Sequence, residues 1–147
     1  MFLKWQKDYD IGHAVIDYDH RNLCNLINAL HHDAHSDLTP EKVTNAYTML
    51  VHYVKEHFAR EEELFSNSDY PHTKQHVNQH RRIEKRVQLG ATLYERIPDE
   101  FDTDEFLAFL KKWLTHHILE TDQGYLPYIK QKDSGKTTAA QDGSSTA

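Results

Sequence analysis

The sequence has almost no cysteine and no long apolar stretch. A single cysteine, Cys24, in 147 residues excludes an internal disulfide framework and is typical of proteins from a reducing cytoplasm. No segment approaches the roughly 20 apolar residues of a transmembrane helix, and the first residues do not form the charged and apolar segments of a signal peptide. We therefore expect a cytoplasmic protein without a membrane span.

An excess of positive charge is also absent. The formal net charge of −6 argues against general nucleic-acid binding. The one basic cluster, Arg81, Arg82, Lys85 and Arg86, is interpreted as a solvated helix face. The length of 147 residues, with 38% hydrophobic and 27% charged residues, indicates a single globular domain.

Apolar residues recur at helical spacing in four stretches, and no strand pattern or internal repeat is evident. Residues 1 to about 17 are expected to form an arm whose Trp5, Tyr9 and Ile11 pack on the body. The first helix is predicted from about Tyr18 to His35, and the second from Pro40 to a break at Ser66–Pro71. The third is predicted to run from that break to a point before Pro98, and the fourth to begin at a capping box at Asp102–Glu105.

Four amphipathic helices with short connections predict an all-α, antiparallel up-down four-helix bundle. After about Lys132 the chain is rich in Ser, Gly, Thr and Ala, which is typical of disordered segments. We therefore expect a bundle domain at residues 1–132 and a flexible, disordered tail at 133–147. No second apolar stripe is evident, so we expect a monomer.

Histidine is the unusual component, with twelve residues. His57 and Glu61, and likewise His76 and His80, stand four apart, which places each pair on one face of a helix. Together with His20 they lie on the apolar stripes that form the core. A buried glutamate is costly unless its charge is compensated, and a metal ion would compensate it. The spacing therefore predicts one shared dinuclear metal site.

The fourth helix leaves the remaining ligands open. His116 and Glu120 repeat the spacing of four, whereas His117 continues the buried stripe. His117 and Asp122 stand five apart, roughly 140° around a regular helix, and both could reach a metal only through a locally unwound turn such as a π-bulge. Periodicity favours His117 and does not select the carboxylate.

Two further residues complicate the pattern. His72 extends the row of His76 and His80, so the register of the third helix is ambiguous. Cys24 follows His20 by four residues, although a small buried thiol is common in protein cores.

Several segments, taken together over roughly residues 5–129, resemble the bacterial hemerythrins. The matching segments are Trp5, Ile16–His20, His57–Glu61, Tyr70–His80 and Trp113–Asp122. One departure is Asp19, at a position where the family often has Gln before the first ligand. The resemblance selects His117 and Asp122 over His116 and Glu120, and His76 over His72.

The resemblance implies a non-haem di-iron centre that binds O2. Two octahedral irons offer about twelve positions, and the family fills all but one of them with five histidines, two bridging carboxylates and an oxo or hydroxo bridge. It assigns His76, His80 and His117 to one iron, and His20 and His57 to the iron with the open position. The implied ligand set is His20, His57, Glu61, His76, His80, His117 and Asp122.

Reversible O2 binding needs a dry pocket. The apolar residues that flank the ligands, and that we expect to form its wall, are Phe58, Trp113, Leu114 and Ile118. Leu114, one turn before His117, is the strongest candidate, whereas Phe58 and Trp113 fit an ordinary core equally well.

The leading hypothesis is a non-enzymatic protein for oxygen storage or for delivery to oxygen-requiring enzymes. The alternatives are a di-iron enzyme acting on peroxide or nitric oxide, and an oxygen or redox sensor acting through a partner. No Glu precedes a His by three residues, which argues against a ferritin-like di-iron site.

Overall fold

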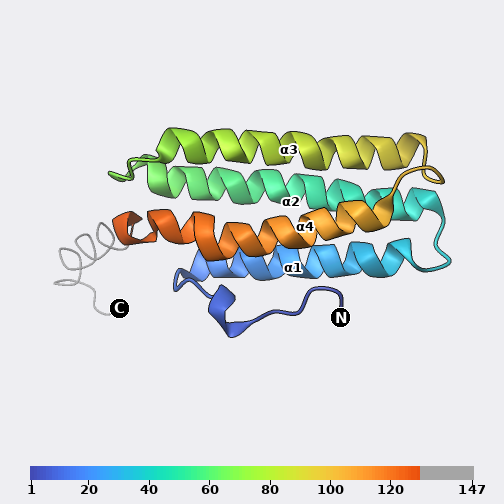
Figure 1. Cartoon of the computed structure of the whole chain (residues 1–147), viewed down its shortest axis with the longest axis horizontal. Helices are drawn as coiled ribbons and strands as arrows, with labels where there is room; N and C mark the ends of the chain where they lie inside the picture. Colours follow the sequence, from blue (N-terminus) through green and yellow to red (C-terminus); the bar gives the residue numbers. More distant parts are fainter. Residues whose placement is uncertain (130–147) are drawn as a thin grey trace, which may run out of the picture.

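The chain folds as an antiparallel up-down bundle in the computed structural model, which describes residues 1–129 (Figure 1). The long helices lie side by side with alternating direction; α2 packs against both α1 and α3, and α4 packs against α1. The described elements are η1 (Lys7–Tyr9), α1 (Ala14–Ala34), α2 (Pro40–Ser66), α3 (Thr73–Arg96), α4 (Thr103–His116) and the π-helical turn η2 (His117–Thr121).

The predicted all-α four-helix bundle is confirmed, and residues 1–129 contain no strand. Residues 122–129 continue the last helix beyond η2. The predicted domain limit at 132 and the predicted tail at 133–147 lie outside the described residues. No helix in the described range combines the length and apolar character needed to cross a membrane.

The first helix begins four residues earlier than expected, at Ala14 rather than Tyr18. The chain turns into it at Gly12, which has a φ of 92° and therefore a conformation that favours glycine. The Asp17 carboxylate accepts hydrogen bonds from the backbone N–H of Ile11, at 2.8 Å, and of Gly12, at 3.2 Å. These bonds fasten the arm to the first turn and shorten it to residues 1–13.

The arm packs on the bundle as predicted. Ile11 is buried, and Trp5 and Tyr9 pack partly buried against the main core. Leu3 is also buried, and Asn28 on α1 both accepts from its N–H and donates to its carbonyl, at 2.8 Å in each case. The arm therefore adds both apolar and hydrogen-bonded contacts to α1.

At the end of the bundle remote from the C-terminal segment, α3 and α4 approach each other closely through a glycine. A Cβ atom built on Gly90 would lie 2.3 Å from Cε1 of Phe106, whose ring belongs to the buried core. Glycine is a poorer helix former than alanine. It is needed at position 90 because a side chain there would collide with the Phe106 ring.

Candidate metal centre

The structure brings the seven sequence-predicted ligand side chains together inside the bundle. Each is at most 3% exposed, and they come from all four helices. Their donor atoms form two overlapping groups, within each of which all atoms lie within 4.8 Å of one another. The groups are His20, His57, Glu61, His117 and Asp122, and Glu61, His76, His80 and His117.

Glu61 lies where the two groups meet. Its Oε1 is 3.1 Å from Nε2 of His57, 3.0 Å from Nε2 of His117 and 3.3 Å from Nε2 of His80. The Nε2 atoms of His57 and His117 are themselves 3.3 Å apart. One carboxylate oxygen therefore faces imidazoles from three helices, an arrangement suited to a ligand shared by two ions.

Asp122 faces the other side of the cluster. Its Oδ2 is 2.8 Å from Nε2 of His20 and 3.0 Å from Nε2 of His117, and its Oδ1 is 3.5 Å from Nε2 of His76. Asp122, like Glu61, thus lies beside histidines of both groups.

A wide helical turn carries Asp122 into the centre. His117–Thr121 forms a π-helical turn, and the N–H of Asp122 bonds to the carbonyl of His117. Because this turn is one residue wider than an α-helical turn, the side chains of His117 and Asp122 lie on the same face, whereas a regular α-helix would separate them. The other pair, His116 and Glu120, lies outside the cluster, with side chains 61% and 70% exposed.

Two other residues with donor atoms also lie outside the cluster. His72 is exposed at the start of α3, where its Nδ1 lies 3.1 Å from Oε1 of Gln75. The Cys24 thiol donates to the carbonyl of Leu3 at 3.4 Å.

Many of the buried donor atoms have no hydrogen-bond partner among the described residues. Both ring nitrogens of His20 and of His76, Nε2 of His80 and both carboxylate oxygens of Asp122 are unpartnered. The short contact between His20 and Asp122 lacks hydrogen-bond geometry. Each buried unpartnered polar group costs about 1–3 kcal/mol. Metal ions would satisfy these atoms, so the donor set fits a dinuclear metal centre.

Burial keeps two imidazoles of the cluster, those of His20 and His76, neutral. It holds the pKa of His20 well below the usual value and lowers the pKa of His76 to about 3. For His57 burial also acts to lower the pKa, but the charge of Glu61 and a hydrogen bond to Asp19 outweigh it and raise the pKa to about 9. Neutral His20 and His76 offer free lone pairs, which is the state that binds a metal.

The two carboxylates differ in charge. Burial acts to raise the pKa of Glu61, but His57 and His117 hold it well below the usual value. Burial and the neighbouring Glu61 raise the pKa of Asp122 well above the usual value. Two carboxylates this close disfavour a second negative charge, and cations between them would remove that repulsion.

A carboxylate–arginine pair supports His57 from outside the cluster. Asp19 is buried and lies 3.0 Å from Nδ1 of His57. It also accepts two bonds from Arg60, both at 2.8 Å, and one from the Tyr53 hydroxyl at 2.7 Å. A hydrogen bond at Nδ1 fixes the ring so that Nε2 is free to face a metal.

His80 is supported in the same way. Its Nδ1 lies 2.8 Å from Oε2 of Glu62, and Glu62 is paired with Arg81. Arg81 is exposed, as expected for a solvated helix face, and its pairing with Glu62 links that face to His80. On the opposite side the Tyr125 hydroxyl donates to Oε2 of Glu61 at 2.7 Å. Sequence reasoning missed these roles, although Asp19 stood out as a departure from the family pattern.

The Asp19 support should be measurable as metal affinity. We expect Asp19→Asn to weaken metal binding by about 10–100-fold, because an amide is a weaker acceptor for the His57 N–H and leaves the Arg60 charge unpaired. Competition against a coloured chelator measures the affinity. Asp10→Asn is the matched control, because Asp10 in the arm forms an exposed pair with Arg21, which lies on α1 as Asp19 does. Equal affinities for the two variants would contradict this role.

Two of the four expected wall residues stack on cluster histidines, and the other two are buried in the core. Leu114 and Ile118 are buried, and the Phe58 ring stacks on His80 at 3.7 Å. Trp113 stacks on His117, with centroids 5.4 Å apart, but is only partly buried. It lines a cavity of about 230 Å³ that it shares with Arg82 and that reaches His80 and His117. Phe58, Leu114 and Ile118 are thus buried apolar side chains, whereas the partly buried Trp113 borders this cavity.

Known proteins with similar sequences point to the same centre. A family model described as "Hemerythrin HHE cation binding domain" matches residues 12–129. The chain belongs to the hemerythrin family. The match contains all seven clustered side chains, so the resemblance predicted from the sequence is confirmed.

Individual hemerythrins align over most of this chain. A protein named Bacteriohemerythrin from Stenotrophomonas maltophilia is 34% identical over 128 residues, which are 87% of this chain and 82% of that protein. A Bacteriohemerythrin from Pseudomonas paraeruginosa is 31% identical over 90% of this chain and 84% of its own length. A third Bacteriohemerythrin, from Clostridium acetobutylicum, is 26% identical over 83% of this chain and 97% of its own length.

Proposed function

We propose that this hemerythrin-family chain binds O2 reversibly, without acting as an enzyme, at a di-iron centre held by the seven clustered residues. The observation that carries the proposal is the buried set of five imidazoles and two carboxylates in two overlapping groups. Nitrogen and carboxylate donors suit iron in octahedral geometry, and an oxo or hydroxo bridge would leave one position open. The iron pair would supply the electrons for O2 binding.

The surrounding side chains support binding without further chemistry. Phe58, Leu114 and Ile118 are at most 1% exposed and would exclude water and nucleophiles. Tyr125 is the hydroxyl that donates to the Glu61 carboxylate. Burial, with the nearby Glu61 charge, raises its pKa well above the usual value, so it keeps its proton at neutral pH.

The proposed setting is a cytoplasmic monomer that stores O2 or delivers it to oxygen-requiring enzymes. Cys24 supports a reducing location, because it is the one cysteine of the chain and is a buried free thiol.

The visible absorption spectrum tests the proposal. We expect the protein loaded with two ferrous equivalents to gain a visible band on addition of O2 and to lose it under vacuum. Asp122→Asn should abolish the band. Glu120→Gln, which changes an exposed carboxylate outside the cluster, should retain it. Immediate and irreversible oxidation of the wild-type protein would overturn the proposal and favour an enzyme or a redox sensor.

A further inference from the structure

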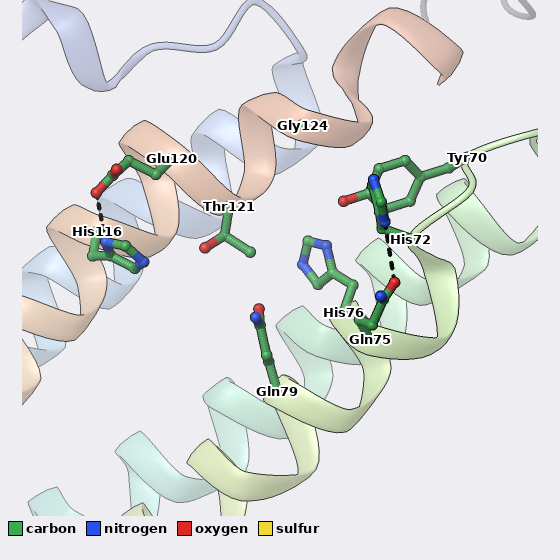
Figure 2. A pocket seen from close by; sticks show the side chains of 9 residues that line it. All are labelled: Tyr70, His72, Gln75, His76, Gln79, His116, Glu120, Thr121 and Gly124. Atoms are coloured by element: carbon green, nitrogen blue, oxygen red, sulfur yellow. Dashed lines mark hydrogen bonds and ion pairs between the residues drawn. The ribbon is translucent and has the colours of Figure 1, made fainter.

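A cavity between α3 and the end of α4 lies directly outside the metal centre. It has a volume of about 450 Å³, and Figure 2 shows the His76 side chain between α3 and the turn that carries Thr121. His76 belongs both to the cavity lining and to the cluster. It is 2% exposed, and neither ring nitrogen has a partner among the described residues. The cavity thus ends at a buried, unpartnered metal-binding group.

The cavity is also lined by three side chains with metal-binding donor atoms that the centre does not use, His72, His116 and Glu120. His116 and Glu120 stand one turn apart on α4 and η2, with Nδ1 and Oε2 at 2.6 Å (Figure 2). His72 lines the cavity from the start of α3. These three residues compete with the buried ligands in the sequence pattern, and in the structure all three line the cavity that ends at His76.

We propose that this cavity is the uptake site for a divalent cation, with His116 and Glu120 as transient ligands and His76 as the residue that receives the ion. The inference rests on the proposed iron centre and names how ferrous iron reaches it. A cation with six bound waters occupies roughly 200 Å³ at about 30 Å³ per water, so the cavity accommodates the hydrated ion.

The charges around this cavity favour a cation more than those around the neighbouring cavity beside Trp113. Glu120 contributes a carboxylate, and no lysine or arginine is among the described residues that line the cavity. The neighbouring 230 Å³ cavity, which also reaches the centre, is lined by Arg82 and Trp113. A guanidinium repels a divalent cation, so the route to His76 is the more favourable one.

The pair of His116 and Glu120 also binds weakly enough to release its ion. In residues 1–129, every close group of three or more donors includes residues of the centre itself. The outer pair offers two exposed ligands on one helical turn, whereas the centre offers seven buried ones. An ion held outside by two side chains and water therefore moves inward to the larger donor set.

The rate at which metal-free protein takes up metal tests the proposal. Co²⁺ serves as a redox-stable probe, because its visible bands report binding by nitrogen and carboxylate donors, and stopped-flow absorption follows them. We expect H116Q/E120Q to load about 10-fold more slowly than wild type. Its final binding of two equivalents and its final spectrum should match the wild-type protein, because both residues lie outside the centre.

The chain supplies a matched control in another exposed His–Glu pair. His52 and Glu56 on α2 have the same spacing, lie 3.4 Å apart and are 74% and 46% exposed. H52Q/E56Q should load at the wild-type rate. Equal rates for H116Q/E120Q and wild type, or equal slowing of both double variants, would overturn the uptake site.

The remaining outcomes separate the uptake site from the centre. Final binding of fewer than two equivalents by H116Q/E120Q would place these residues in the centre and refute a transient role. If wild-type protein binds no metal, the proposed iron centre fails together with its route. Normal two-ion loading with an unaltered variant rate would remove the route alone.

Discussion

Removing the metal should lower the midpoint of thermal unfolding by about 10 °C or more. A site occupied at about 1,000 times its dissociation constant adds roughly 4 kcal/mol to the folded state, and a domain of this size gains about 3 °C per kcal/mol. The structural reason is the cluster itself, whose seven side chains are at most 3% exposed. Without metal, several of their donor atoms lack partners.

Thermal unfolding followed by circular dichroism, before and after treatment with a chelator, measures this difference. Glu120→Gln should keep the full difference, because its carboxylate is exposed outside the cluster. Asp122→Asn should lose most of it, since it removes a carboxylate that faces histidines of both groups. Identical midpoints for metal-loaded and metal-free wild type would contradict the account.

Gly90→Ala should destabilise the protein by about 2 kcal/mol, although alanine is the better helix former. The new Cβ would lie 2.3 Å from Cε1 and 2.6 Å from Cζ of Phe106. That ring is 3% exposed in the core and cannot move away without displacing its neighbours. Urea unfolding of the metal-free protein measures the loss without a contribution from bound metal.

Two companion variants identify the clash as the cause. Gly124→Ala adds the same atom where the nearest group is the Tyr70 hydroxyl at 3.3 Å, the end of a side chain, so its effect should stay within about 0.5 kcal/mol. Phe106→Leu combined with Gly90→Ala should recover part of the loss, giving a non-additive pair. A fully additive pair would show that the alanine acts elsewhere.

The bundle could be predicted from the sequence because its apolar stripes keep a helical period. The break at Pro71 and the end before Pro98 also follow from local chemistry, and α3 occupies Thr73–Arg96 between them. The start of α1 could not be placed in the same way. It depends on Gly12 at a positive φ and on the Asp17 carboxylate bonded to the arm, which are contacts between segments and leave no periodic signal.

The centre was predictable to the extent that its ligands follow regular helix geometry. His57 with Glu61, and His76 with His80, occupy the expected faces of α2 and α3. The position of Asp122 depends on a π-turn, which periodicity allows but does not select. The choice of Asp122 rather than Glu120 as the carboxylate ligand came from the resemblance to the hemerythrin family.

The residues that support the ligands were harder to find. Asp19 and Glu62 each stand beside a ligand in the sequence, next to His20 and Glu61 respectively, yet each bonds to a histidine of another helix. A one-dimensional pattern reports which face a residue occupies and gives no partner across the bundle. Adjacent acidic residues at a metal-ligand position were the available signal.

The wide turn at His117–Thr121 also bears on chain length. Before it, Leu110, Leu114 and His117 face inward, and after it Asp122, Tyr125 and Ile129 do so, one residue out of step with the earlier count. Elsewhere in a helix, losing one residue rotates everything beyond it by about 100°. Here the loss would convert the π-turn into an ordinary turn with both rows still inward. An alignment of related chains therefore has a physical place for a one-residue gap.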